Sequence, residues 1–338
     1  MDKKSFGQLS NGQETYLYTI SCGKLSAEIT DYGATLVRLW APDKNGELAD
    51  VILGYSTAAD YERENTFQGA IVGRNANRIS NATVVMNGTT YSLPQNEGQN
   101  NLHSGPDFFN KRMWTVEEVT ENSICLYLYS PNADQGYPGN AHIRVRYTME
   151  TTGLVIEYNA FCDMDTVFNL TNHSSFNVAG HNHPERAMEQ ELTLPARCYT
   201  VADANSIPTG EMRPVEGTPM DFRSPKPIGR DINMDYEALN LQGGYDHNYE
   251  VFCNPCAILT DPKTGRSMAV YTDLPGIQVY ACNYIEKENG KDGITYTKRS
   301  GICLETQYYP DSVNHPEWEQ PITKAGELYR TVTRYLFK

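Results

Sequence analysis

The chain has 338 residues and a formal net charge of −14, and it contains no run of about 18 apolar residues, so a transmembrane helix is excluded. Its acidic balance disfavours nucleic acids and anionic membranes as partners, because both repel negative charge. Aromatic residues (11%) and charged residues (21%) occur in proportions typical of a globular rather than a disordered protein.

The first local signals along the chain indicate a short helix and a hairpin. Residues 57–60, Thr-Ala-Ala-Asp, could begin one or two helical turns. Strands expected at 83–86 and 89–93 flank Asn87 and Gly88. Because this dipeptide best tolerates a positive φ at both turn positions, the segment predicts a tight β-hairpin.

Alternation of apolar and polar residues dominates the rest of the chain. From Ile143 to Met149 every second residue is apolar, which is typical of a half-buried strand, and the turn at Thr152-Gly153 leads into a partner strand at 154–158. Many short strands between Gly, Asn and Pro turns predict an all-β fold of antiparallel sheets packed face to face. Since no linker or repeat interrupts the pattern, we expect one domain over residues 1–338. Further strands are expected at 124–129, 276–282 and 329–337, and a second short helix at 184–192.

Neither of the two motifs that suggest a metal is complete. Cys253 and Cys256 form the only close pair among eight cysteines, but a zinc site would need a second ligand pair, and a redox motif would need a βαβ pattern. His181 and His183 are followed directly by Pro184, so a surface turn is favoured there. The first residues do not lead into the apolar segment of a secretory leader. We therefore expect a cytoplasmic protein with reduced thiols and no metal.

Polar side chains gather in five short segments, each beside a turn signal, which is where a rigid sheet usually carries a site. Taken singly, most of them also fit ordinary roles such as a solvated loop or a turn-capping aspartate. His173 lies in a dense polar cluster and titrates nearest neutral pH. Glu305 is a single carboxylate in an apolar strand, where a charge is rarely buried without a partner or a task. The segments are 73–78, 100–105, 169–177, 243–249 and 302–307.

Together and in this order, these segments resemble the aldose 1-epimerase family, also called the galactose mutarotase family. The resemblance implies a large antiparallel β-supersandwich with an open sugar cleft. It also implies an isomerase that interconverts the α and β anomers of free aldoses, chiefly galactose and glucose. We expect the partner to be a monosaccharide and the protein to be a monomer or a weak homodimer. The motifs that carry the resemblance, which covers nearly the whole chain, are 31–35, 50–55, 73–78, 101–103, 171–177, 244–248 and 304–307.

The resemblance also implies roles for individual residues. His173 is the general acid that protonates the ring oxygen, and Glu305 is the general base that takes the proton of the anomeric hydroxyl. His103 lies beside the ring oxygen. The residues expected to contact the rest of the sugar are Asn77, Arg78, Ser175, Asp246 and Gln278. The sequence departs from the family pattern near the expected cleft, which affects substrate preference rather than the acid and base, at Ser104, Phe108, Ser175 and Ala281-Cys282.

Mutarotation suits these residue types because it moves only protons. It opens the hemiacetal, rotates C1 and closes the ring on the other face, so no cofactor is expected. An acid and a base on opposite sides of the C1–O5 unit are sufficient. The pair is expected to work near neutral pH if His173 is largely protonated and Glu305 is ionised, and an adjacent carboxylate would help hold the charge on the imidazole.

Three alternative functions stay open at this point. A β-sandwich glycoside hydrolase would use two carboxylates, such as Asp246 and Glu305, but would leave His173 unexplained. A non-catalytic sugar-binding protein would need aromatic and polar loops without an acid–base pair. A hexose-6-phosphate epimerase of the same fold would need a basic phosphate pocket, and no such pocket can be located in the sequence.

Overall fold

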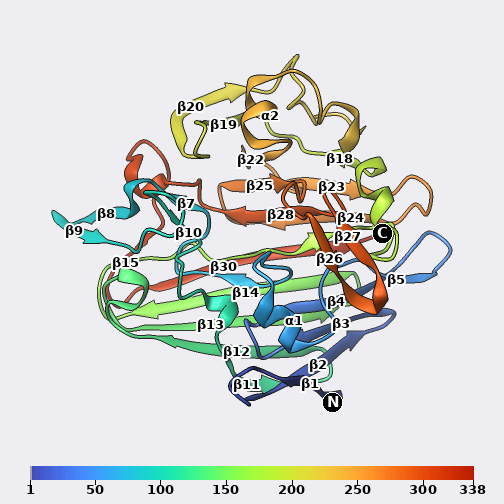
Figure 1. Cartoon of the computed structure of the whole chain (residues 1–338), viewed down its shortest axis with the longest axis horizontal. Coiled ribbons are helices and arrows are strands. Elements are labelled where there is room, and N and C mark those ends of the chain that lie inside the picture. The colour runs from blue at the N-terminus through green and yellow to red at the C-terminus, as the bar shows by residue number, and fades with distance from the viewer. Residues whose placement is uncertain (1) are drawn as a thin grey trace.

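The computed structural model describes residues 2–338, which fold into three large antiparallel sheets and several two-stranded pairs (Figure 1). The long strands β14 and β30 lie side by side in the middle of the largest sheet. In spatial order, its nine strands are β11 (Thr115–Val119), β12 (Ser123–Ser130), β13 (Ala141–Glu150), β14 (Gly153–Cys162), β30 (Leu328–Phe337), β24 (Ser267–Thr272), β23 (Ala257–Thr260), β18 (Glu191–Thr193) and β21 (Lys226–Pro227).

The other two large sheets have six and five strands. The six-stranded sheet runs in the order β17 (Ser175–Phe176), β28 (Ile302–Gln307), β25 (Gly276–Tyr280), β22 (Asp246–Glu250), β19 (Cys198–Ala202) and β20 (Pro208–Pro214). The five-stranded sheet is a meander of β1 (Asp2–Gln8), β2 (Glu14–Cys22), β3 (Leu25–Thr30), β4 (Leu36–Pro42) and β5 (Leu48–Asp50).

Short strand pairs and short helices make up the remaining regular structure. The pairs are β6 (Ile71–Val72) with β16 (Thr171–Asn172), β7 (Arg78–Ile79) with β10 (Asn101–Leu102), β8 (Thr83–Met86) with β9 (Thr89–Ser92), β15 (Thr166–Val167) with β29 (Ile322–Thr323), and β26 (Lys287–Asn289) with β27 (Thr295–Thr297). The α-helices are α1 (Ala58–Arg63) and α2 (Glu237–Gln242), and single 3-10 turns occur at 80–82, 109–111, 134–136, 228–230, 291–293 and 312–314. No helix within residues 2–338 is long and apolar enough to cross a bilayer.

The prediction of an all-β protein built from antiparallel sheets is confirmed, and so are most of the expected elements. Asn87 (φ 51°) and Gly88 (φ 75°) form the hairpin turn between β8 and β9. The alternating segment at 143–149 lies in β13 and pairs with β14, as expected. Helix α1 begins after Thr57, whose hydroxyl accepts a hydrogen bond from the Asp60 amide.

The expectation for residues 184–192 is only partly correct. Pro184–Glu189 forms a 3-10 helix, but Leu192 lies in strand β18 and pairs with Leu259 of β23. Leu192 is fully buried in the core between the sheets. Tertiary packing therefore overrides the local helical signal at the end of this segment.

One face of the six-stranded sheet packs on the apolar core, and the opposite face is available to form a site. In β28, Ile302 and Leu304 belong to the largest core cluster, and the Thr306 hydroxyl hydrogen-bonds the Thr333 hydroxyl on β30 of the nine-stranded sheet. Successive side chains of a strand alternate between faces. Cys303, Glu305 and Gln307 therefore lie on the opposite face, away from this core.

Candidate active site

Strand register places three of the predicted residues on one face of the six-stranded sheet. Glu305 of β28 pairs with Gln278 of β25, and Asp246 of β22 pairs with Tyr280, two positions beyond Gln278. Directly paired residues share a face, and so do residues two apart in a strand. Ser175 of β17 joins the same row because it pairs with Cys303.

The opposite wall of the site comes from loops and short strand pairs. Asn77 and Arg78 lie at the start of β7, His103 directly follows its partner β10, and His173 directly follows β16. Together the walls line an open cleft with a volume of about 170 Å³. The structure brings all of the predicted site residues to this cleft: Asn77, Arg78, His103, His173, Ser175, Asp246, Gln278 and Glu305.

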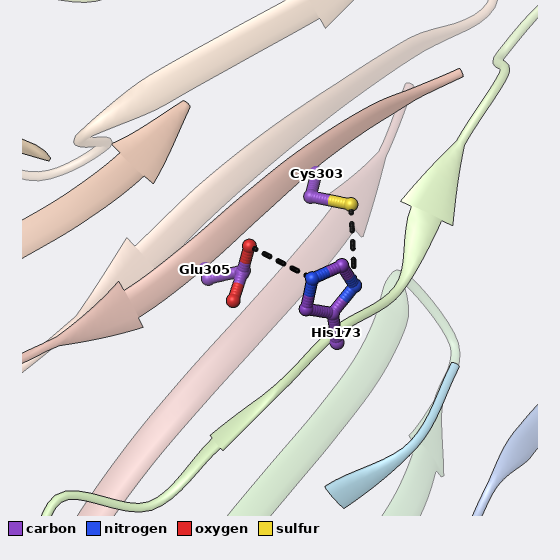
Figure 2. A group of neighbouring side chains, drawn as sticks. All are labelled: His173, Cys303 and Glu305. Atoms are coloured by element: carbon purple, nitrogen blue, oxygen red, sulfur yellow. Dashed lines mark hydrogen bonds and ion pairs between the residues drawn. The ribbon is translucent and has the colours of Figure 1, made fainter. Parts of the chain in front are cut away.

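The His173 imidazole lies between a carboxylate and a thiol (Figure 2). Its Nε2 is 3.7 Å from Oε1 of Glu305, and its Nδ1 is 3.6 Å from Sγ of Cys303. The backbone of His173 is fixed, since its amide donates to the Ala70 carbonyl at 2.8 Å. Oε2 of Glu305 is buried without a hydrogen-bond partner within residues 2–338. The carboxylate therefore has an acceptor available for a hydroxyl group of a ligand.

Burial opposes charge on both members of this pair. Desolvation lowers the pKa of His173 to about 4. Desolvation, followed by the negative charge of Asp246, raises the pKa of Glu305 well above its usual value. This differs from the expectation of a protonated His173 and an ionised Glu305. Both shifts favour a neutral His173 and a protonated Glu305, the arrangement that leaves neither group charged.

His103 presents a defined tautomer to the cleft. Its Nδ1 accepts a hydrogen bond from the Asn77 amide at 3.1 Å, so the neutral ring carries its hydrogen on Nε2. Burial, with a smaller contribution from the charge of His173, lowers the pKa of His103 well below its usual range. His103 is therefore a neutral hydrogen-bond donor near neutral pH.

The remaining polar residues of the cleft are fixed by one another. Gln278 donates to Oδ1 of Asp246 at 2.7 Å, and Gln307 donates to Oε1 of Gln278 at 3.3 Å. The Arg78 guanidinium donates to both carboxylate oxygens of Glu97, at 2.7 and 2.9 Å. These contacts preorganise hydrogen-bonding groups before any ligand arrives.

Several aromatic residues that line the cleft were not predicted from the sequence. Phe67 packs against His103 and His173, with ring centroids 4.9 and 5.7 Å apart, and Tyr280 lies 5.9 Å from His173. Phe67 follows no turn motif, so its sequence context gave no signal. Tyr280 and Tyr284 could have been found, because they flank a segment already noted for departing from the family pattern.

Four non-glycine residues that line this cleft have a positive φ. Phe67 (φ 56°), Asn77 (φ 63°), His103 (φ 52°) and Cys282 (φ 47°) all adopt left-handed conformations and all line the cavity. Non-glycine residues rarely occupy this region unless the surrounding structure enforces it, and such residues cluster at functional sites.

Some residues of the polar segments lie elsewhere. Arg74 is fully buried and donates to the carbonyls of Ser130 and Pro138, so its role is structural. His181 is buried rather than on a surface turn as predicted, and its Nδ1 hydrogen-bonds the Tyr296 hydroxyl at 2.9 Å. The surface prediction for His181 is therefore wrong, because Tyr296, far away in the sequence, covers it.

Comparisons with known proteins agree with this architecture. A family model described as aldose 1-epimerase matches residues 16–336. A galactose mutarotase from Mus musculus is 38% identical over 341 residues, which cover 98% of this chain and 97% of the mouse protein. An aldose 1-epimerase from Haemophilus influenzae is 39% identical, with 93% of each chain covered. The solved structure of an aldose epimerase homologue from C. elegans aligns with a TM-score of 0.88 at 30% identity, covering 96% of this chain and 99% of that one. The chain belongs to the aldose 1-epimerase family.

Proposed function

We propose that this protein interconverts the α and β anomers of free aldoses with His173 as general acid and Glu305 as general base. The observation that carries the assignment is the pairing of the two groups in the cleft, with Nε2 and Oε1 3.7 Å apart and one carboxylate oxygen unpartnered. The family membership supports the reaction class, and the geometry supports the two roles.

Ring opening needs one proton added and one removed. Glu305 takes the proton of the O1 hydroxyl while His173 gives a proton to the ring oxygen O5, the C1–O5 bond breaks and the C1–O1 bond becomes a carbonyl. Rotation about C1–C2 then presents the other face of the carbonyl. The same two groups reverse their proton transfers as the ring closes. Each positioned acid or base contributes about 10²–10⁴-fold to such a step.

The proton distribution of the His173–Glu305 pair has to change when sugar binds. The neutral pair and the ion pair contain the same single proton, so no proton needs to enter or leave the protein. A sugar hydroxyl that donates to Glu305 stabilises its carboxylate form and lowers the pKa of that group. Binding thereby moves the shared proton to His173, and the complex contains the acid and base that the reaction requires.

The charges of the cleft favour a neutral sugar over a sugar phosphate. Arg78 is the single Lys or Arg side chain among the cleft residues of the described chain, and Glu97 already neutralises it. Asp246, on the opposite wall, adds a negative charge to the same cleft. A phosphate dianion would find no free cation there, so the hexose-6-phosphate alternative is disfavoured.

Polarimetry of freshly dissolved α-D-glucose and α-D-galactose tests the proposal. We expect the protein to accelerate the approach to equilibrium rotation for both sugars, and to release no reducing sugar from aryl β-galactosides and aryl β-glucosides. Glycoside cleavage that depends on Asp246 and Glu305 would support a hydrolase instead. Sugar binding without acceleration of rotation would support a non-catalytic binding protein.

A further inference from the structure

Cys303 lies in the active site, although the proposed reaction gives it no task. It is fully buried on the cleft face of β28, two positions before Glu305. Its Sγ contacts both His173 Nδ1 at 3.6 Å and the Ser175 hydroxyl at 3.2 Å. The imidazole therefore lies between a thiol at Nδ1 and a carboxylate at Nε2 (Figure 2).

The spacing of these groups matches that of ligands around a tetrahedral zinc ion. Zinc binds thiolate sulfur at about 2.3 Å and imidazole nitrogen at about 2.1 Å, so at a tetrahedral angle the two ligand atoms lie about 3.6 Å apart. This equals the distance between Cys303 Sγ and His173 Nδ1. Ligand atoms of His173, Cys303 and Glu305 all lie within 4.8 Å of one another. His173 offers one nitrogen to an ion, so an ion at Nδ1 lies beside Cys303, and Glu305 has to turn from Nε2 toward it to supply a third ligand.

The cluster of His173, Cys303 and Glu305 also contains an oxygen atom that has no hydrogen-bond partner. Oε2 of Glu305 is buried and accepts no hydrogen bond from any residue in 2–338. His173 and Glu305 both line the open cleft, whereas Cys303 lies behind them. An ion that enters from solvent would thus reach all three side chains and keep one coordination position toward the cleft.

We propose that His173, Cys303 and Glu305 bind a thiophilic divalent cation, Zn²⁺ or Cd²⁺, and that the occupied site is inactive. The inhibition rests on the proposed function, because the cation takes the carboxylate of the general base and draws it away from Nε2 of the general acid. Binding exchanges the thiol proton of Cys303, and the carboxyl proton where Glu305 carries it, for bonds to the cation. Both protons leave to solvent, and no oxidation state changes.

Sequence motifs alone point to a different place for a metal. Cys253 is exposed and Cys256 is buried, with its thiol donating to the Val270 carbonyl at 3.3 Å. Within residues 2–338, the group formed by His173, Cys303 and Glu305 is the one cluster of three such ligands close enough to hold an ion. A cation is therefore expected in the cleft and not at the cysteine pair.

Titration of chelator-treated protein with Cd²⁺ tests binding without reference to activity. The ultraviolet charge-transfer band of a Cd²⁺–thiolate bond should saturate at one equivalent in the wild type. Cys303→Ser should abolish the band, while Cys256→Ser, which changes another buried thiol, should leave it intact. Saturating galactose should weaken Cd²⁺ binding, because sugar and ion share the cleft.

Inhibition provides the second measurement. Zn²⁺ should slow mutarotation by the wild type and by Cys256→Ser with the same inhibition constant. In Cys303→Ser this constant should rise at least about tenfold, since loss of even an outer ligand contact costs that much affinity. If Cys303→Ser does not fold, Glu305→Gln serves instead, and it should keep the Cd²⁺ band but bind the ion more weakly.

Three results would overturn the metal proposal: no saturable band in the wild type, an unchanged band in Cys303→Ser, or Cd²⁺ binding that galactose does not affect. Failure of the proposed function would look different. In that case the metal-free wild type would not accelerate mutarotation, whatever the Cd²⁺ titration shows.

Discussion

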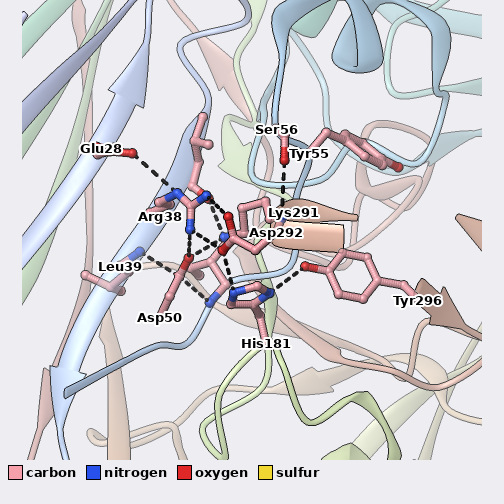
Figure 3. Close-up of polar contacts among 12 residues, drawn as sticks. Glu28, Arg38, Leu39, Asp50, Tyr55, Ser56, His181, Lys291, Asp292 and Tyr296 are labelled. Carbon is pink, nitrogen blue, oxygen red and sulfur yellow. Dashed lines mark hydrogen bonds and ion pairs between the residues drawn. The ribbon is translucent and has the colours of Figure 1, made fainter. Parts of the chain in front are cut away.

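The active-site cleft and a second cluster of buried charges differ in how completely their buried charged groups are paired. This second cluster, here called the Lys291 network, lies where the five-stranded sheet meets β26, β27 and the segment around His181 (Figure 3). Its central residues are Arg38, Asp50, His181, Lys291, Asp292 and Tyr296.

Every charge in the Lys291 network has a partner. Lys291 is fully buried and donates to Oδ2 of Asp50 at 2.6 Å and to the Val37 carbonyl at 2.7 Å. Arg38 donates to both carboxylate oxygens of Asp292 at 2.7 Å. Arg38 holds the pKa of Asp292 at about 2. These contacts offset part of the cost of taking the charges out of water.

In the cleft, by contrast, the pairing is incomplete. Glu305 keeps a buried oxygen without a partner, and its 3.7 Å separation from His173 is too long for a direct hydrogen bond. Because Glu305 also lines the open cleft, a ligand can complete its hydrogen bonding. The two regions should therefore respond differently to the same kind of substitution.

The largest effect on activity is expected for Glu305→Gln. The amide keeps the shape of the side chain but cannot act as a base, so kcat should fall by about 10²–10⁴-fold. Folding should be unaffected, because a buried carboxyl with a raised pKa is replaced by a neutral group. Glu288→Gln is the matched control, since Glu288 is a buried carboxyl outside the cleft that accepts from the Tyr55 hydroxyl. A Glu305→Gln variant that keeps more than about a tenth of the wild-type rate would show that Glu305 is not the base.

The double variant of His173→Asn with Glu305→Gln should lose less activity than the product of the two single losses. Residues that act as one proton-transfer unit are non-additive, because removing either one already disables the unit. Polarimetric rates of the two single variants and the double variant form the required cycle. Strictly multiplicative losses would indicate that the two residues serve separate steps.

Lys291→Met should affect stability instead of catalysis. It leaves the buried carboxylate of Asp50 without its closest cation, which costs about 3 kcal/mol of unfolding free energy. Adding Asp50→Asn should recover part of this loss, because the uncompensated charge is then removed. The folded variant should keep the wild-type mutarotation rate, and a fall in rate per folded molecule would contradict a purely structural role.

The pH dependence of stability gives a separate check on Lys291. Burial lowers its pKa in the folded protein to about 8, from an ordinary value of 10.5. Between these values the unfolded chain binds the proton and the folded chain does not, so this group makes the protein more stable as pH rises from about 8 to 10.5. The difference in unfolding free energy between the wild type and Lys291→Met should grow over this interval in denaturant titrations.

Much of this contrast could not be predicted from the sequence. Local patterns were sufficient for the Asn87-Gly88 hairpin and for the strand at 143–149, and the chemistry of His173 and Glu305 singled them out. Lys291 and His181 look like surface residues, because their partners Asp50 and Tyr296 are distant in the sequence. The position of Cys303 beside His173 depends on the register of β17 on β28, which no local pattern specifies. The single domain and the monomer or weak dimer stay predictions.

The pH profile of activity distinguishes the buried His173–Glu305 pair from a His–Glu pair with unshifted pKa values. The active pair carries one proton, so kcat/KM falls when a second proton binds and when the last one leaves. Burial opposes a positive charge on His173, so the acidic limb lies toward pH 4. Burial also opposes a negative charge on Glu305, so its raised pKa moves the alkaline limb to higher pH. Asp246→Asn removes a negative charge that raises this pKa, and should shift the alkaline limb to lower pH. An alkaline limb that does not move would show that Asp246 does not act on Glu305.

The smallest effect is expected at Cys253 and Cys256, which belong to neither region. Burial raises the pKa of the Cys256 thiol to about 12, so it is not a thiolate near neutral pH and is a poor nucleophile, and it belongs to no group of three metal ligands within residues 2–338. Serine can still donate to the Val270 carbonyl, and Cys253 is exposed, so the double Ser variant should keep the wild-type mutarotation rate and lose little stability. Thiol titration of the denatured, unreduced wild type should find all eight cysteines free. Any zinc that copurifies with the protein should be retained by this double variant and lost from Cys303→Ser. Loss of zinc together with activity in the double variant would place the metal at the cysteine pair and overturn both the thiol assignment and the metal-free reaction.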